Sequence, residues 1–300
     1  MNGMLPFGLK NAPSEFQKIM NDIFTPYGEF ILVYIDDILV FSKDIESHFK
    51  HLNILRKIVI QKGLVISKPK MSLFQTKIRF LGHYIEKSNI IPINRSIDFA
   101  DKFPDEITNK TQLQRVLGNL NYISSYYKDI AQDTAILYDI LKKNPKPWSE
   151  DHTQAVRKLK EKVKTLPCLM LSNPSWDKIV ETDASDIGYG GILKQIDPQN
   201  KQEYLVRFYS GKWNNSQKNY ATIAKEILAI VKCVLKFQDD LYNQKFIIKT
   251  DCNFAKFMFN KDFKHDVSKQ MVARWQAHLA PFDFEIVYKK GSKTIVFQIF

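Results

Sequence analysis

The chain has 300 residues, of which 44% are hydrophobic and 25% are charged, with 11 glycines and 12 prolines. This is the composition of a globular protein, and it excludes collagen-like and low-complexity chains. No apolar run approaches the roughly 18 residues of a membrane span, and the first residues lack the apolar region of a secretory signal. The 44 Lys and Arg residues outnumber the 32 Asp and Glu residues, which gives a net charge of +12 and favours polyanionic partners such as nucleic acid.

Cysteine usage points to a reducing compartment. Cys168, Cys233 and Cys252 form an odd, widely spaced set without a C-x-x-C pair. Neither a disulfide framework nor a zinc ribbon is therefore expected.

Three blocks are distinguished along the chain. Residues 1–88 mix helical and strand patterns, residues 89–170 are mostly helical, and residues 171–300 alternate strands with helices. The third block is introduced by the turn signal Ser172-Asn-Pro-Ser175.

The first predicted helix starts near Pro13, because proline suits the first turn of a helix. Ser14 and Gln17 have the spacing of an N-terminal capping box. An apolar stripe with helical spacing follows, formed by Phe16, Ile19, Met20, Ile23 and Phe24.

Residues 30–41 form two β-rich runs on either side of Asp36 and Asp37, which predicts a β-hairpin. Hairpin turns favour Asn-Gly or Asp-Gly, and two adjacent carboxylates repel each other. The pair is therefore either a structural turn or a divalent metal site.

In the third block, residues 179–193 predict a strand, a turn and a second strand, with Asp183 ending the first strand. The glycines after it, Gly188, Gly190 and Gly191, suit a close backbone approach or a bulge. A helix is predicted over 222–237, and Glu226 lies on its apolar side, where a carboxylate must be paired, protonated or metal-bound. Asp251 follows the β-rich run 245–250.

These motifs resemble the reverse transcriptases. Phe7-Gly-Leu-Lys-Asn-Ala-Pro13 followed by Tyr34-Ile-Asp-Asp37 is similar to the family's motifs B and C, and Lys62-Gly-Leu-Val-Ile-Ser-Lys-Pro-Lys70 is similar to its motif D. Phe80-Leu-Gly-His83 looks like the primer grip, and residues from 175 onward resemble a ribonuclease H domain. The polyproteins of plant pararetroviruses (the caulimovirus group) are the nearest match, followed by gypsy-type retrotransposons.

The resemblance implies a multidomain α+β and α/β fold. Residues 1–88 would be a partial right-hand polymerase palm, residues 89–170 a thumb and connection region, and residues 171–300 a ribonuclease H-like α/β domain with a mixed sheet. The implied polymerase metal ligands are Asp36 and Asp37. The residues implied to contact nucleotide or template-primer are Phe7, Gly8, Tyr34, Lys70, Leu81 and Gly82. Lys70 is alternatively a solvated surface lysine.

The same resemblance makes Asp183, Glu226 and Asp251 the catalytic and metal-binding carboxylates of the ribonuclease H site. The implied cofactor is Mg²⁺, with Mn²⁺ as a substitute, and the implied ligands are RNA–DNA hybrid, template-primer and deoxynucleoside triphosphates. The expected protein is a monomer, cytoplasmic or virion-associated, with no membrane partner.

Two departures from the family pattern limit these expectations. The family has a further catalytic Asp upstream of motif B, so polymerase activity of this chain alone is not expected. Gln298 stands where the family has a fourth ribonuclease H carboxylate. The chain is therefore expected to be a truncated reverse transcriptase, and the alternative is a catalytically dead remnant that only binds nucleic acid. A purely structural protein would not explain three ordered carboxylates together with Tyr-Ile-Asp-Asp.

Overall fold

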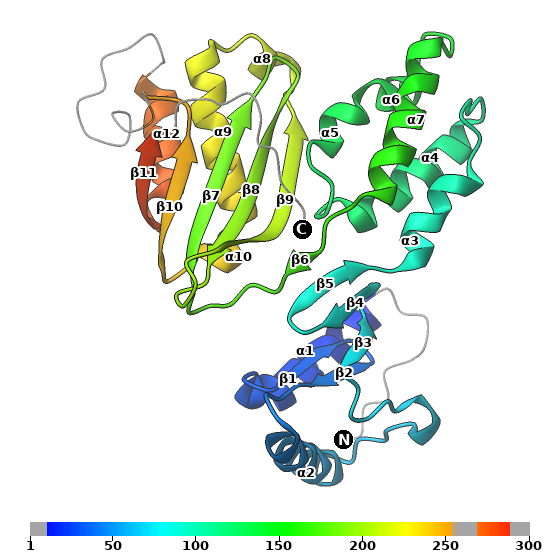
Figure 1. The fold of residues 1–300 in the computed structure, drawn as a ribbon, viewed down its shortest axis with the longest axis vertical. Helices are drawn as coiled ribbons and strands as arrows, with labels where there is room; N and C mark the ends of the chain where they lie inside the picture. The colour runs from blue at the N-terminus through cyan, green and yellow to red at the C-terminus, as the bar shows by residue number, and fades with distance from the viewer. Residues whose placement is uncertain (1–10, 254, 256–268, 289–300) are drawn as a thin grey trace. The chain divides into compact units, whose positions relative to one another are not determined.

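The fold is that of a computed structural model, which describes residues 11–253, 255 and 269–288. Phe7, Gly8 and Gln298 lie outside these described residues. The chain divides into two compact units, Met1–Phe80 and Leu81–Phe300, and each is considered by itself (Figure 1).

The first unit packs a helix and a hairpin around a small core. Its elements are α1 (Ala12–Phe24), β1 (Ile31–Tyr34), β2 (Asp37–Val40), α2 (Ile45–Lys62) and β3 (Lys77–Phe80). The predicted first helix and hairpin are confirmed. Met20, Phe24, Ile31 and Ile58 are the buried residues of the core.

The predicted capping box of α1 is wrong. Ser14 lies inside the helix, the N-cap is Asn11, and no side chain caps the helix start. Gln17 instead contacts the backbone of the hairpin. Gln17 therefore makes a tertiary contact with the hairpin in place of the cap that its spacing from Ser14 predicts.

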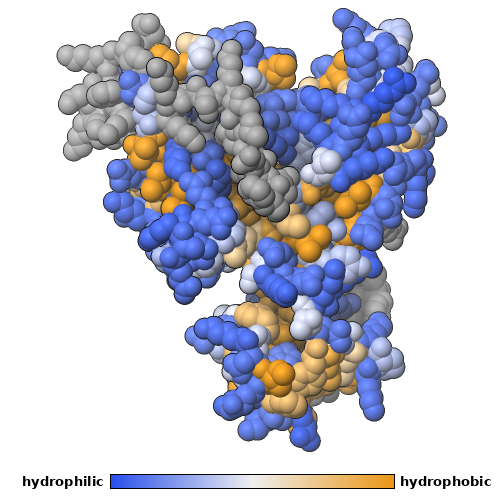
Figure 2. Space-filling view, viewed as in Figure 1, coloured by the Kyte–Doolittle hydropathy of each residue, from blue (hydrophilic) through white to orange (hydrophobic). Residues whose placement is uncertain are grey.

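The first unit leaves large apolar side chains in water. Ile45, Ile60 and Val65 are 70%, 67% and 97% exposed, and Figure 2 shows hydrophobic residues at the surface of this unit. Extended exposed apolar surface indicates an interaction face.

The second unit begins with a helical region closed by a small sheet. Its elements are β4 (His83–Glu86), β5 (Asn89–Pro92), α3 (Asn94–Asp98), α4 (Lys110–Leu120), α5 (Ile130–Asp133), α6 (Ala135–Ile140), α7 (Glu150–Lys164) and β6 (Leu169–Met170). The antiparallel pairs Ile90↔Leu169 and Asn89↔Met170 join the two ends of the region. Its core includes the fully buried Leu113, Ile123 and Leu137.

A five-stranded mixed sheet follows, in the order β11-β10-β7-β8-β9. Its elements are β7 (Asp177–Ala184), β8 (Gly188–Ile196), β9 (Glu203–Lys212), α8 (Asn215–Lys218), α9 (Thr222–Lys236), α10 (Gln238–Leu241), β10 (Lys245–Thr250), α12 (Lys269–Leu279) and β11 (Asp283–Tyr288). β10 pairs in parallel with β7 and β11, whereas β8 is antiparallel to both of its neighbours. The apolar stripe of α9 supplies eight buried residues to this core.

The predicted strands, helix and mixed sheet are thus confirmed for this region. The glycine segment allows close packing rather than a bulge, since the register shift lies farther along, between Leu193 and Lys194. A Cβ atom on Gly191 would lie only 2.5 Å from the Cys233 Sγ atom of α9.

All three cysteines are free. Among the described residues, we find no helix with the length and apolar character needed to cross a membrane.

Candidate active sites

Three carboxylates converge at one edge of the mixed sheet. Asp183 is the penultimate residue of β7, and Asp251 directly follows β10. These strands are parallel neighbours, so their carboxyl ends lie at the same edge. Glu226 reaches this edge from the first turns of α9, and one oxygen from each of the three side chains lies within 4.8 Å of the others.

Glu226 is the buried member of the group. Its side chain is only 8% exposed, and its Oε2 atom has no hydrogen-bond partner. Burial raises the pKa of Glu226 to about 8, helped by the negative charges of Asp251 and Asp183 and opposed by a hydrogen bond from the Ala184 backbone. Without a cation, this carboxyl holds a proton at neutral pH.

Asp183 lies at the exposed side of the group. Partial loss of hydration raises its pKa, and the charge of Asp251 raises it further. The charge of Lys128 lowers this pKa, but it does not outweigh these effects. Two acids with raised pKa values at one place indicate an excess of negative charge there.

The donor set fits a divalent metal ion. All the donor atoms are carboxylate oxygens, which suit hard cations such as Mg²⁺ and Mn²⁺. The buried Oε2 of Glu226 lacks a protein partner, and a cation would compensate this orphaned atom. The structure therefore brings together Asp183, Glu226 and Asp251, the three residues that the sequence predicted.

Asp36 and Asp37 lie at the tip of the hairpin in the first unit. Tyr34 pairs with Asp37, so the turn itself is formed by Ile35 and Asp36. Tyr34, Asp36 and Asp37 are exposed. Ile35 has a left-handed φ of 50°, which is an outlier for a β-branched residue and a form of strain that accumulates at functional sites.

Gln17 of α1 holds this strained turn. Its Oε1 atom accepts a hydrogen bond from the Ile35 backbone N–H, and its Nε2 atom donates to the Val33 carbonyl at 3.3 Å. Sequence reasoning misassigned Gln17 to a cap, because only the fold brings it to the hairpin.

We predict that Gln17→Ala loosens the turn. The Ile35 N–H loses its acceptor, which costs about 1 kcal/mol, so its amide should exchange with solvent about fivefold faster. Hydrogen exchange followed by NMR measures this. Asn21→Ala removes only the 2.7 Å bond from Gln17 Nε2 to Asn21 Oδ1 and should leave Ile35 protected; equal exchange in both variants would contradict the assignment.

The other residues predicted to contact nucleotide or template-primer lie in separate segments of the chain. Lys70 is exposed in a short 3₁₀ helix, Lys68–Lys70. Leu81 and Gly82 both have left-handed backbone, with φ values of 48° and 81°, and Leu81 is 44% exposed. Phe7 and Gly8 are not among the described residues.

Comparison with sequence families gives two matches. Residues 2–85 match the family described as reverse transcriptase (RNA-dependent DNA polymerase), and residues 148–248 match the RNase H-like domain found in reverse transcriptase. The first range includes the hairpin, and the second includes Asp183 and Glu226. The chain is a member of the reverse transcriptases that carry a ribonuclease H-like domain.

Similar curated proteins include plant-virus polyproteins. The chain is 38% identical to the enzymatic polyprotein of Cauliflower mosaic virus (strain D/H) over 292 residues, covering 96% of this chain and 43% of that protein. It is also 38% identical to the enzymatic polyprotein of Carnation etched ring virus, over 97% of this chain and 44% of that protein. The chain therefore spans less than half the length of these relatives.

Solved structures agree on the fold. The foamy viral protease-reverse transcriptase in complex with RNA/DNA hybrid matches with a TM-score of 0.80 at 19% identity, covering 98% of this chain and 41% of that one. The complex of its dRH form with double-stranded DNA also gives a TM-score of 0.80, at 19% identity, covering 96% of this chain and 50% of that one.

Proposed function

We propose that the chain supplies two active sites of a reverse transcriptase: the metal-binding hairpin of an RNA-directed DNA polymerase, and a ribonuclease H site that cleaves the RNA strand of RNA–DNA hybrids. The observation that carries the proposal is the convergence of Asp183, Glu226 and Asp251 around a buried oxygen with no partner. In this proposal residues 1–88 are part of the palm, residues 89–170 the thumb and connection, and residues 171–300 the ribonuclease H-like domain.

Asp183, Glu226 and Asp251 would hold Mg²⁺, with Mn²⁺ as a substitute. When bound, such ions lower the pKa of water and stabilise the attacking and leaving oxygens of phosphodiester hydrolysis. The protein's own contribution is positional: β7, β10 and α9 fix the three carboxylates in one place before substrate binds. Burial of Glu226 keeps one side of the site dry, which strengthens its electrostatic interactions.

In the polymerase hairpin, Asp36 and Asp37 would bind the metal ions that act on a deoxynucleoside triphosphate and the primer terminus. Tyr34, Lys70, Leu81, Gly82, Phe7 and Gly8 would contact nucleotide or template-primer. The net charge of +12 supports binding of both template-primer and hybrid without sequence preference, through their phosphates. We propose that the chain acts as a monomer, because all three carboxylates of the ribonuclease H site come from one chain.

The test is hydrolysis of an end-labelled RNA–DNA hybrid by the purified chain, scanned over Mg²⁺ and Mn²⁺. We expect metal-dependent cleavage of the RNA strand that Asp183→Asn removes. Hybrid binding without cleavage at any metal concentration would reject the catalytic proposal. It would favour the alternative of a nucleic-acid-binding protein without activity, which the net charge also supports.

Metal binding should depend on pH. Since Glu226 has a pKa raised to about 8, a cation must displace its proton below that pH. The apparent affinity should therefore rise by up to about tenfold per pH unit between pH 6 and 8 and level off above it. Mn²⁺ titration followed by electron paramagnetic resonance measures this, and an affinity that is flat across the range would contradict the assignment of Glu226 as a ligand.

A further inference from the structure

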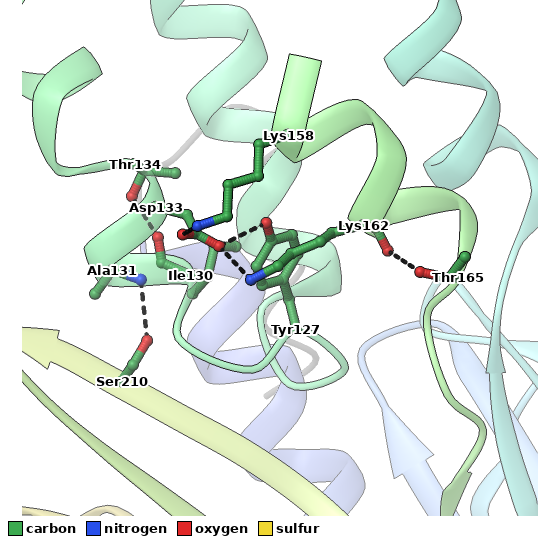
Figure 3. A network of polar contacts seen from close by, with 9 residues as sticks. All are labelled: Tyr127, Ile130, Ala131, Asp133, Thr134, Lys158, Lys162, Thr165 and Ser210. Atoms are coloured by element: carbon green, nitrogen blue, oxygen red, sulfur yellow. Dashed lines mark hydrogen bonds and ion pairs between the residues drawn. The ribbon is translucent and has the colours of Figure 1, made fainter. Parts of the chain in front are cut away.

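A segment of the helical region docks against the edge strand of the mixed sheet. The Ser125 carbonyl accepts a hydrogen bond from the Phe208 N–H at 2.8 Å, and the Ala131 N–H donates to Ser210 Oγ at 3.0 Å. Between these two anchors lies Asp129, immediately before α5. Figure 3 shows Ala131 reaching Ser210 on its strand.

The same segment is fixed on its other side by Asp133. The Asp133 carboxylate accepts hydrogen bonds from Tyr127 Oη at 2.9 Å, Lys158 Nζ at 2.6 Å and Lys162 Nζ at 2.7 Å (Figure 3). Hydrogen bonds therefore hold the chain in place on both sides of Asp129.

Strand register places Asp129 beside the metal-binding carboxylates. Asp183, Gly190 and Ser210 are partners across β7, β8 and β9, so they share one face of the sheet. Gly190 has no side chain, and the Asp129 carboxylate lies close to the space where one would be. A Cβ atom on Gly190 would lie 2.9 Å from Asp129 Oδ1. The Asp129 carboxylate therefore lies next to Asp183 on that face, and its charge contributes to the raised pKa of Asp183, after loss of hydration and Asp251.

Asp129 has no evident structural task. Its side chain does not cap α5, and its φ of 62° is a conformation that glycine and asparagine adopt more readily. Burial raises the pKa of Asp129 although the charges of Lys128, Lys162 and Lys158 lower it, and Lys158 and Lys162 are themselves ion-paired to Asp133. A half-buried carboxylate beside another carboxylate is costly unless a cation compensates it.

We propose that Asp129 is a fourth acidic group of the metal centre, contributed by the helical region rather than by the ribonuclease H-like domain. This inference rests on the proposed function. The oxygens within 4.8 Å of one another are those of Asp183, Glu226 and Asp251, so Asp129 acts as a positioning residue that holds the ion through bound water. Two divalent ions carry four positive charges, and Asp129 raises the negative charge facing them from three to four.

The test is Mn²⁺ binding to the full chain without nucleic acid, followed by electron paramagnetic resonance. The parent chain for this test carries Asp36→Asn and Asp37→Asn, so that the hairpin does not contribute to binding. Asp129→Asn should weaken binding about tenfold, the lower end of the effect of groups that contact metal ligands or their waters. Asp129→Gly, which suits the same backbone, should give the same loss and so separate the carboxylate from the conformation. Asp139→Asn is the matched control: it changes net charge equally at an exposed side chain paired with Lys142, and it should bind like the parent chain.

The Asp183→Asn variant distinguishes a failure of the Asp129 proposal from a failure of the proposed metal centre. If Asp183→Asn abolishes binding while both Asp129 variants bind within twofold of the parent, Asp129 has no role and the proposed function stands. If Asp183→Asn binds like the parent chain, the metal centre itself is rejected together with Asp129. Circular dichroism and thermal unfolding in EDTA should match the parent for the Asp129 variants, so that a weaker Mn²⁺ affinity reports the site and not the fold.

Discussion

Glu226→Gln is expected to lower hybrid cleavage about 1000-fold, the equivalent of about 4 kcal/mol of transition-state stabilisation. The variant keeps the size of the side chain and removes the charge that would hold the metal. The same change should make the metal-free protein more stable at alkaline pH. Loss of activity and gain of stability are therefore expected together.

The sign of the stability effect follows from proton binding. Burial, Asp251 and Asp183 raise the pKa of Glu226 to about 8 in the folded chain, from its ordinary value of 4.5. Between these values the folded protein holds a proton that the unfolded chain has lost. The free energy of unfolding therefore falls as pH rises through that window. Glutamine cannot ionise, so the variant lacks this part of the slope.

Urea unfolding in EDTA at pH 5, 7 and 9 measures the effect. The difference between variant and parent should increase with pH, and Mg²⁺ should stabilise only the parent. A variant that cleaves hybrid within tenfold of the parent would exclude Glu226 from the site. A variant that is less stable than the parent at pH 9 would contradict the electrostatic explanation.

Much of this site could be predicted from sequence because the resemblance to reverse transcriptases implies its three carboxylates and the local pattern around each of them agrees. Asp251 directly follows the β-rich run 245–250, and Asp183 lies near the end of another β-rich run, while the helical period of 222–237 places Glu226 on a buried face. Parallel pairing of β7 and β10 then brings the two strand ends together. The hairpin was predictable for the same reason, since each of its strands is a short β-rich run.

The contacts made by Gln17 and Asp129 could not be predicted in this way. Gln17 has the spacing of a cap, yet its two bonds to the hairpin depend on how α1 packs against β1. Asp129 reaches Gly190 only because α5 docks on β9, and no local pattern relates these segments. The left-handed φ of Ile35 likewise follows from a turn that Gln17 holds, and not from the preference of isoleucine.

Gly191→Ala is expected to destabilise the second unit by about 1–3 kcal/mol, the usual cost of an extra methyl group in a tightly packed core. The new Cβ atom would lie 2.5 Å from Cys233 Sγ, 3.0 Å from Cys233 Cβ and 3.4 Å from the Phe237 ring. Both neighbours are on or directly after α9 and are fully buried, so the helix itself must move. Because α9 carries Glu226 and β8 pairs with β7 beside Asp183, the shift should also weaken Mn²⁺ binding.

A double-mutant cycle tests whether this contact is the cause. Cys233→Ala removes the sulfur atom at 2.5 Å but keeps the Cβ atom at 3.0 Å, so it should relieve part of the strain. A favourable coupling of about 1 kcal/mol between the two substitutions is expected for residues in direct contact. Gly118→Ala is the matched control: it adds the same methyl group inside α4, where nothing lies within 4 Å, and it should stabilise the protein by about 0.5–1 kcal/mol. Additive effects of Gly191→Ala and Cys233→Ala would mean that α9 is not held against β8 by this contact, and the position of Glu226 would then need another explanation.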